Sequence, residues 1–122
     1  SYQLIKSVLE ESSKAVYQGK IFVNSDAQKT NGYQLSKAIL LNKNSEFNAK
    51  PELEIYADDV KCSHGSASGS LDDNTIFYLM SRGLNYEQSK ELLINGFLLD
   101  VVAKITDVEV KNLIKNLIGV KE

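Results

Sequence analysis

The sequence predicts an α+β fold in which strands occupy the first half of the chain and helices the second. Short apolar runs bounded by Gly, Asn, Ser and Pro fill residues 1–70, as is typical of β-strands. Three segments with apolar residues at helical spacing and capping residues at their ends fill residues 72–120. Because the strands precede the helices, this order favours an α+β fold over alternating βαβ units. We therefore expect two parts, residues 1–70 and residues 71–122.

The first part should contain several short strands. Its apolar runs are Ala15–Tyr17, Ile21–Val23, Leu35–Leu41 and Leu53–Ala57. In residues 52–57 apolar and polar side chains alternate, which puts the two kinds on opposite faces of a strand. Many short strands without intervening helices are typical of a sandwich, a barrel or a β-solenoid. The pattern does not choose among these, and no exact internal repeat is evident.

The second part should begin with a helix capped by Asp72 or Asp73, because a carboxylate accepts hydrogen bonds from the first backbone N–H groups. Gly83 has the place of a residue that ends such a helix. The expected apolar stripe of this helix consists of Ile76, Phe77 and Met80.

Two further helices should follow, each beginning with a capping box. Asn85 and Gln88 form the first box, and Thr106 and Glu109 form the second. The wide apolar face between them consists of Leu92, Leu93, Gly96, Phe97, Leu99 and Val102, with Gly96 as an expected close-packing point. Gly119 closes the pattern of the last helix.

Charge and composition exclude several classes of function. With 14 Lys and Arg against 16 Asp and Glu, the net charge of -2 gives no basis for binding nucleic acid or an anionic membrane surface. No apolar run approaches the roughly 20 residues that span a bilayer. The single cysteine excludes an internal disulfide and fits a reducing, cytoplasmic compartment. Apolar residues directly after Ser1 lead us to expect a segment cut from a longer chain.

Cys62 and His64 are the candidate metal-binding residues. In an extended strand they would lie on one face with Cα atoms roughly 6.5–7 Å apart. A thiolate and a neutral imidazole are good ligands for iron, zinc or copper(I). Two ligands do not complete a site, so the others would come from another chain. Asp58 and Asp59 could add oxygen ligands, although they precede the pair by several residues.

Two other interpretations of the pair remain open. Cys62 can be a buried structural thiol beside an incidental His64, since free cysteine packs like a small hydrophobic residue. The pair can also be a Cys–His catalytic dyad, but no third group is evident to orient the histidine. The segment between Gly65 and Gly69 lacks the Gly-Lys-Ser/Thr ending of a P-loop and is expected to be a connecting loop.

One continuous run carries a resemblance to a known family. Residues 50–65 read Lys-Pro-Glu-Leu-Glu-Ile-Tyr-Ala-Asp-Asp-Val-Lys-Cys-Ser-His-Gly, which closely resembles the signature of the SufB/SufD family of iron–sulfur cluster assembly scaffolds. Further elements of the family pattern are Gln28–Gly32, Leu71-Asp72, Phe77-Tyr78-Leu79, Arg82-Gly83 and Gly96-Phe97. The Cys-Ser-His-Gly stretch favours the SufD branch, in its C-terminal part. Residues 66–70 depart from the Ala-Thr-Val-Gly type usual after the motif.

This resemblance implies a fold, partners and a site. The fold would be the last coils of a right-handed parallel β-helix in residues 1–70, followed by a helical domain. The partners would be SufB, through the end of the β-helix, and the ATPase SufC, through the helical domain. A transient iron–sulfur cluster would form at the SufB interface with Cys62 and His64 as candidate ligands, and the isolated chain would hold none.

The resemblance also implies which surface binds SufC. Candidate contacts flank the expected turn at Gly83: Tyr78, Arg82, Tyr86 and Glu87. The chain would be a scaffold and not an enzyme, with no catalytic residues. A purely structural interaction module without metal ligation is the alternative. Because a truncated solenoid exposes an end, the chain by itself can also form a homodimer.

Overall fold

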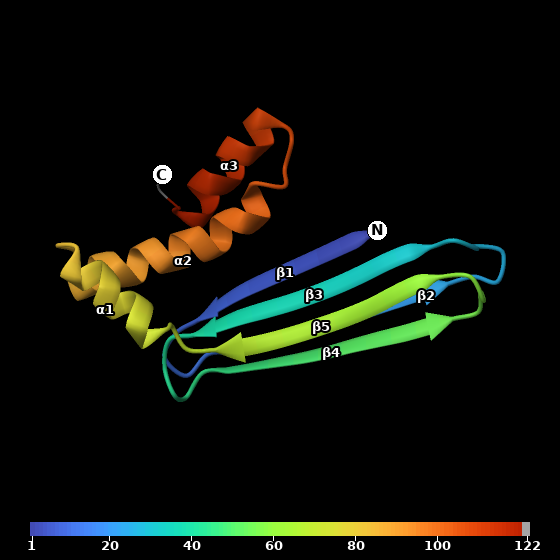
Figure 1. The fold of residues 1–122 in the computed structure, drawn as a ribbon, viewed down its shortest axis with the longest axis horizontal. Helices are drawn as coiled ribbons and strands as arrows, with labels where there is room; N and C mark the ends of the chain where they lie inside the picture. The colour runs from blue at the N-terminus through green and yellow to red at the C-terminus, as the bar shows by residue number, and fades with distance from the viewer. Residues whose placement is uncertain (121–122) are drawn as a thin grey trace. The chain divides into compact units, whose positions relative to one another are not determined.

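The computed structural model describes residues 1–120 and contains five strands followed by three helices, which confirms the predicted α+β class (Figure 1). The elements are β1 (Tyr2–Leu9), β2 (Lys14–Val23), β3 (Asn31–Leu40), β4 (Glu46–Ile55), β5 (Lys61–Gly69), α1 (Asp73–Ser81), α2 (Tyr86–Val102) and α3 (Val108–Ile118). Contacts within the chain separate a strand unit, which ends at Gly69, from a helical unit that starts at Ser70.

Successive strands of the strand unit alternate between two parallel sheets. One sheet has the order β1-β3-β5 and the other pairs β2 with β4. The strands of the two sheets run in opposite directions (Figure 1). Each strand therefore stacks on the strand two before it in the sequence. The pairing of residues shows this stacking: Tyr2 of β1 pairs with Tyr33 of β3, and Lys14 of β2 pairs with Glu46 of β4.

A short repeat underlies the stacking of β1 on β3. The tripeptide Tyr-Gln-Leu occurs at residues 2–4 and again at 33–35, and the register aligns the two copies. The rings of Tyr2 and Tyr33 stack with centroids 5.6 Å apart. Gln34 Nε2 donates a hydrogen bond of 2.8 Å to Gln3 Oε1. The expectation that the chain has no exact internal repeat is therefore wrong.

The core of the strand unit lies between the two sheets. Ile21, Val23 and Ala57 are buried there, and partly buried Val60 and Cys62 pack against them. On β3 the buried residues alternate along the strand: Gly32, Gln34, Ser36 and Ala38. This alternation defines the inner face of the sheet, which looks toward β2 and β4.

Two expectations for the strand unit need correction. Residues 65–69 form the second half of β5 and are not a connecting loop, because they continue the parallel pairing with β3 up to Ile39↔Gly69. Pro51 lies inside β4 and does not bound it. A proline is compatible with this place because β4 lies at an edge of its sheet in the described chain.

The helix boundaries follow the predicted caps with one exception. Asp72 accepts a hydrogen bond from Thr75 N at the start of α1, and Asn85 with Gln88 forms the expected capping box of α2. The start of α3 was predicted one residue early, because Asp107 and not Thr106 accepts from the first backbone N–H groups. Gly119 ends α3 with φ 68°, the left-handed conformation that favours glycine.

The packing of the helical unit differs from the sequence prediction. In α1, Ile76 is buried, but Phe77 of the predicted stripe is 74% exposed. In α2, a Cβ at Gly96 would meet nothing within 4 Å, so Gly96 is not a close-packing point. The spacing of apolar residues therefore predicted where the helices lie, but not which of their apolar side chains are buried by other segments. No helix within residues 1–120 is long and apolar enough to cross a membrane.

Candidate functional site

Cys62 and His64 lie two residues apart on β5, as predicted for a strand. Their register partners on β3 are Gly32 and Gln34, both of which are buried. Parallel pairing puts residues in register on the same face, so both candidate ligands belong to the inner face. The small residues Ser66 and Ser68 are the next residues on the same face, toward the end of β5.

The Cys62 thiol is half-buried against the core. A Cβ at Gly32 would lie 3.5 Å from Cys62 Sγ and 3.5 Å from Ile21 Cγ2. The Cys62 sulfur thus lies between β3 and Ile21 of the opposite sheet, at ordinary contact distance from the Gly32 position. Cys62 therefore contributes to packing, as the structural interpretation predicted, while the residue as a whole is only partly buried.

His64 is exposed because of its position at the end of the stack. In the described chain β5 forms one edge of its sheet and β4 forms an edge of the other. The side chains of Leu53 and Ile55 belong to the inner side of β4, in register with buried Ile21 and Val23, yet they are 40% and 37% exposed. We call this surface, formed by Leu53, Ile55, Cys62 and His64, the open end.

The site is incomplete as a metal centre. Among residues 1–120 no group of three or more His, Cys, Asp or Glu side chains is placed to hold a metal ion. The suggestion that Asp58 and Asp59 complete the ligand set is therefore wrong for this chain alone. The open end offers one thiol and one imidazole, whereas a closed site of the zinc type takes four ligands.

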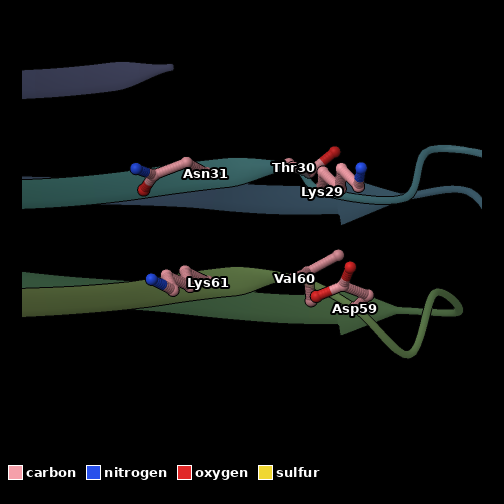
Figure 2. Close-up of a pocket in the computed structure, with 6 residues that line it drawn as sticks. All are labelled: Lys29, Thr30, Asn31, Asp59, Val60 and Lys61. Carbon is pink, nitrogen blue, oxygen red and sulfur yellow. The ribbon is translucent and has the colours of Figure 1, made fainter.

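A separate hollow of about 310 Å³ lies where β3 and β5 begin (Figure 2). Its lining residues are Lys29, Thr30, Asn31, Asp59, Val60 and Lys61. The two turns that form it are linked by hydrogen bonds, from Lys29 N to the Asp59 carbonyl oxygen and from Asp59 N to Gln28 Oε1 at 2.9 Å. Asp59 thus belongs to this hollow, whose lining includes neither Cys62 nor His64.

An ion-pair network covers the outer face of β2 and β4. Lys20 Nζ lies 2.8 Å from Glu54 Oε2 and 3.5 Å from Glu52 Oε2, and the Tyr56 hydroxyl donates to Glu54 at 2.7 Å. The hydrogen bond from Lys20 lowers the pKa of Glu54, and the same bond raises the pKa of Lys20. Donation to Glu54 also raises the pKa of Tyr56. These groups are solvent-exposed, so the network contributes little to stability.

The candidate SufC contacts all lie on the surface of the helical unit. Tyr78 is 54% exposed and Tyr86 is 53% exposed. The guanidinium carbon of Arg82 lies 5.3 Å from the centre of the Tyr78 ring, which is a cation–π distance. Glu87 is exposed in the first turn of α2. The structure thus pairs two of the four residues directly.

Comparison with known proteins identifies the family. A family model described as "SUF system FeS cluster assembly, SufBD core domain" matches residues 1–97. The chain belongs to the SufBD core family. The predicted resemblance to this family is thereby confirmed.

Several SufBD relatives align with nearly the whole chain. SufD of Escherichia coli is 40% identical over 119 residues, which are 98% of this chain and 28% of that protein. SufD of Bacillus subtilis is 34% identical over 121 residues, 99% of this chain and 27% of that protein. A SufBD family protein of Synechocystis is 43% identical over 103 residues, 84% of this chain and 23% of that protein. The chain therefore spans about a quarter of the length of these relatives.

Sequence reasoning missed one residue that lies beside the candidate site. Gln34 is 1% exposed and is the register neighbour of His64. The signal that could have found it is the repeated Tyr-Gln-Leu, because stacking of the two copies puts Gln3 and Gln34 in one row. The segment that carries His64 lacks this tripeptide, so only the register links His64 to the row.

Proposed function

We propose that this chain is a scaffold segment of the SUF system that helps to build a nascent iron–sulfur cluster at an interface with SufB. The observation that carries the proposal is the open end, where Cys62 and His64 share the inner face of an edge strand. Membership of the SufBD family indicates that the chemistry of such a pair would be the binding of iron during cluster assembly. The proposed role includes no turnover by this chain, so it has no catalytic residues.

The open end has the features of an incomplete interface. The edges of β4 and β5 offer backbone groups for strand pairing, and Leu53 and Ile55 offer apolar surface. A partner that covers this end would bury these side chains and bring further ligands toward Cys62 and His64. The cluster is cargo in this scheme, held transiently and passed on. Without the partner, the same edges favour self-association of the chain.

We further propose that the strand unit is the last part of a right-handed parallel β-helix, with residues 1–70 as its coils and residues 71–122 as a C-terminal helical domain. Strands that alternate between two parallel sheets support this view. Connections between parallel strands of one sheet are right-handed in about 98% of cases. The lone thiol of Cys62 suits a reducing compartment such as the cytoplasm.

The helical unit is proposed to bind SufC around the turn at Gly83. Its support is the exposed cluster of Tyr78, Arg82, Tyr86 and Glu87, in which Arg82 is held over the Tyr78 ring. Aromatic and arginine side chains are the residue types that dominate the energy of such interfaces. A purely structural module, which holds SufB and SufC without ligating iron, remains the second candidate because Cys62 also packs against the core.

The deciding experiment compares His64→Ala with wild type in the full-length protein assembled with SufB and SufC. Cluster loading and thermal stability are measured on the same samples. We expect loading to fall sharply while any loss of thermal stability is no larger than that of one hydrogen bond, because an exposed histidine otherwise contributes little to folding. Ser63→Ala, on the opposite face of β5, is the matched control and should load normally. Full loading by the His64 variant would leave the structural module as the better explanation.

A further inference from the structure

Gln34 is a buried polar side chain whose amide oxygen has no hydrogen-bond partner among the described residues. It lies in the middle of β3 and is 1% exposed. Its Nε2 donates a hydrogen bond of 2.8 Å to Gln3 Oε1, so the amide nitrogen has a partner on β1. Its Oε1 is also buried and has no hydrogen-bond partner among the described residues. Buried polar atoms are normally satisfied, so an orphaned amide oxygen requires an explanation.

The register indicates which residue that oxygen can serve. Gln3, Gln34 and His64 form one row across the sheet, through the pairings Gln3↔Gln34 and Gln34↔His64. In a ladder of stacked glutamines each amide donates toward one neighbour and accepts from the other. Because Gln34 donates toward β1, its acceptor oxygen is left for β5. The row position on β5 is occupied by His64.

The opposite sheet keeps the Gln34 amide in this row. A Cβ at Gly19 of β2 would collide with Gln34 Nε2 and with the Tyr17 hydroxyl. The glycine therefore makes the space that the amide fills, and the Tyr17 ring borders it. A side chain so enclosed cannot swing away to satisfy its oxygen in solvent. The Tyr17 hydroxyl does not donate to that oxygen in the structure, and the other neighbouring position that carries a donor in the row is His64.

We propose that Gln34 is a positioning residue for His64, whose exposed ring turns so that one ring N–H donates a hydrogen bond to Gln34 Oε1, a bond that is not formed in the described structure. This bond would fix the imidazole tautomer and orientation and leave the other ring nitrogen free to bind iron. Ligating histidines commonly donate their second N–H to a fixed acceptor, which sets the tautomer and raises the basicity of the ligating nitrogen. The proposal rests on the ligand role of His64 described above.

The test uses the full-length protein assembled with SufB and SufC, labelled with 15N-histidine and free of cluster. The signals of His64 are assigned by their loss in His64→Asn. In wild type we expect one dominant neutral tautomer with a slowly exchanging N–H. A rapidly exchanging mixture of tautomers in wild type would overturn the proposal, whatever the variants do.

Two substitutions separate positioning from packing. Gln34→Met removes the acceptor and the ladder bond to Gln3, whereas Gln3→Met removes only the ladder bond. We expect Gln34→Met to mix the His64 tautomers and to weaken iron binding about tenfold or more, as loss of such supporting partners does. Gln3→Met should preserve the tautomer. If Gln34→Met does not fold, the wild-type measurement decides by itself, because a mixture of tautomers there overturns the proposal.

The outcomes also separate this inference from the proposed function. Equal tautomer signals in wild type and Gln34→Met would refute the positioning role, even if His64→Ala abolishes loading. A tautomer that depends on Gln34 while His64→Ala loads normally would support the hydrogen bond and refute the ligand role.

Discussion

Substitution of Gly19 by Ala tests the packing that holds the Gln34 amide in place. Gly19 belongs to the inner side of β2, and any Cβ there would collide with the Gln34 amide nitrogen and the Tyr17 hydroxyl. Both colliding groups are ends of side chains, but the Gln34 side chain is buried and hydrogen-bonded to Gln3. The methyl group can therefore be accommodated only if the amide leaves its position.

The expected cost follows from three contributions. Overpacking of an interior site costs about 1–3 kcal/mol. Loss of the bond between Gln34 and Gln3 costs about 0.5–1.5 kcal/mol. Replacement of glycine by alanine inside a strand raises the free energy of unfolding by about 0.5–1 kcal/mol, because alanine loses less conformational freedom on folding. We therefore expect Gly19→Ala to lower the free energy of unfolding by about 0.5–4 kcal/mol.

Urea denaturation of the full-length protein measures this change, with the midpoint shifting and the slope unchanged. Gly69→Ala is the matched control, because Gly69 also lies in a strand and a Cβ there would meet nothing within 4 Å. That variant should be as stable as wild type or slightly more so. Equal stability of Gly19→Ala and Gly69→Ala would refute the packing argument. Adding Gln34→Ala should reduce the cost of Gly19→Ala, since one of the two collisions disappears.

The remaining predictions concern the helical unit. Asp107→Ala should destabilise α3 by about 1 kcal/mol because its carboxylate caps the helix, whereas Thr106→Ala, one residue earlier, should change the denaturation midpoint little. Arg82→Glu should weaken SufC binding by about tenfold, measured by calorimetry, while the same charge change at exposed Lys43 of the strand unit should not. Unchanged affinity after replacing Tyr78, Arg82, Tyr86 and Glu87 together would exclude this surface as the docking site.

Local patterns in the sequence determined a large part of this protein. The order of strands before helices, the capping box at Asn85 and Gln88, and the terminal glycines Gly83 and Gly119 could all be predicted. Each depends on residues within a few positions of one another, where backbone geometry leaves few choices. The spacing of Cys62 and His64 likewise predicted a shared strand face, and the run around them predicted the family.

Only the tertiary structure decided which distant residues meet. The link between Gln34 and His64 depends on strands that pair across 30 residues of sequence (34 to 64), and nothing local in either strand specifies that register. The same holds for the contact of Cys62 with the core and for the space beside Gly96, where an added Cβ would meet no other segment of residues 1–120. Burial is a property of the assembled sheets and helices, because a side chain is covered only by what other segments bring to it. Local periodicity can thus mark an inner face, but the packing of remote segments determines what occupies it.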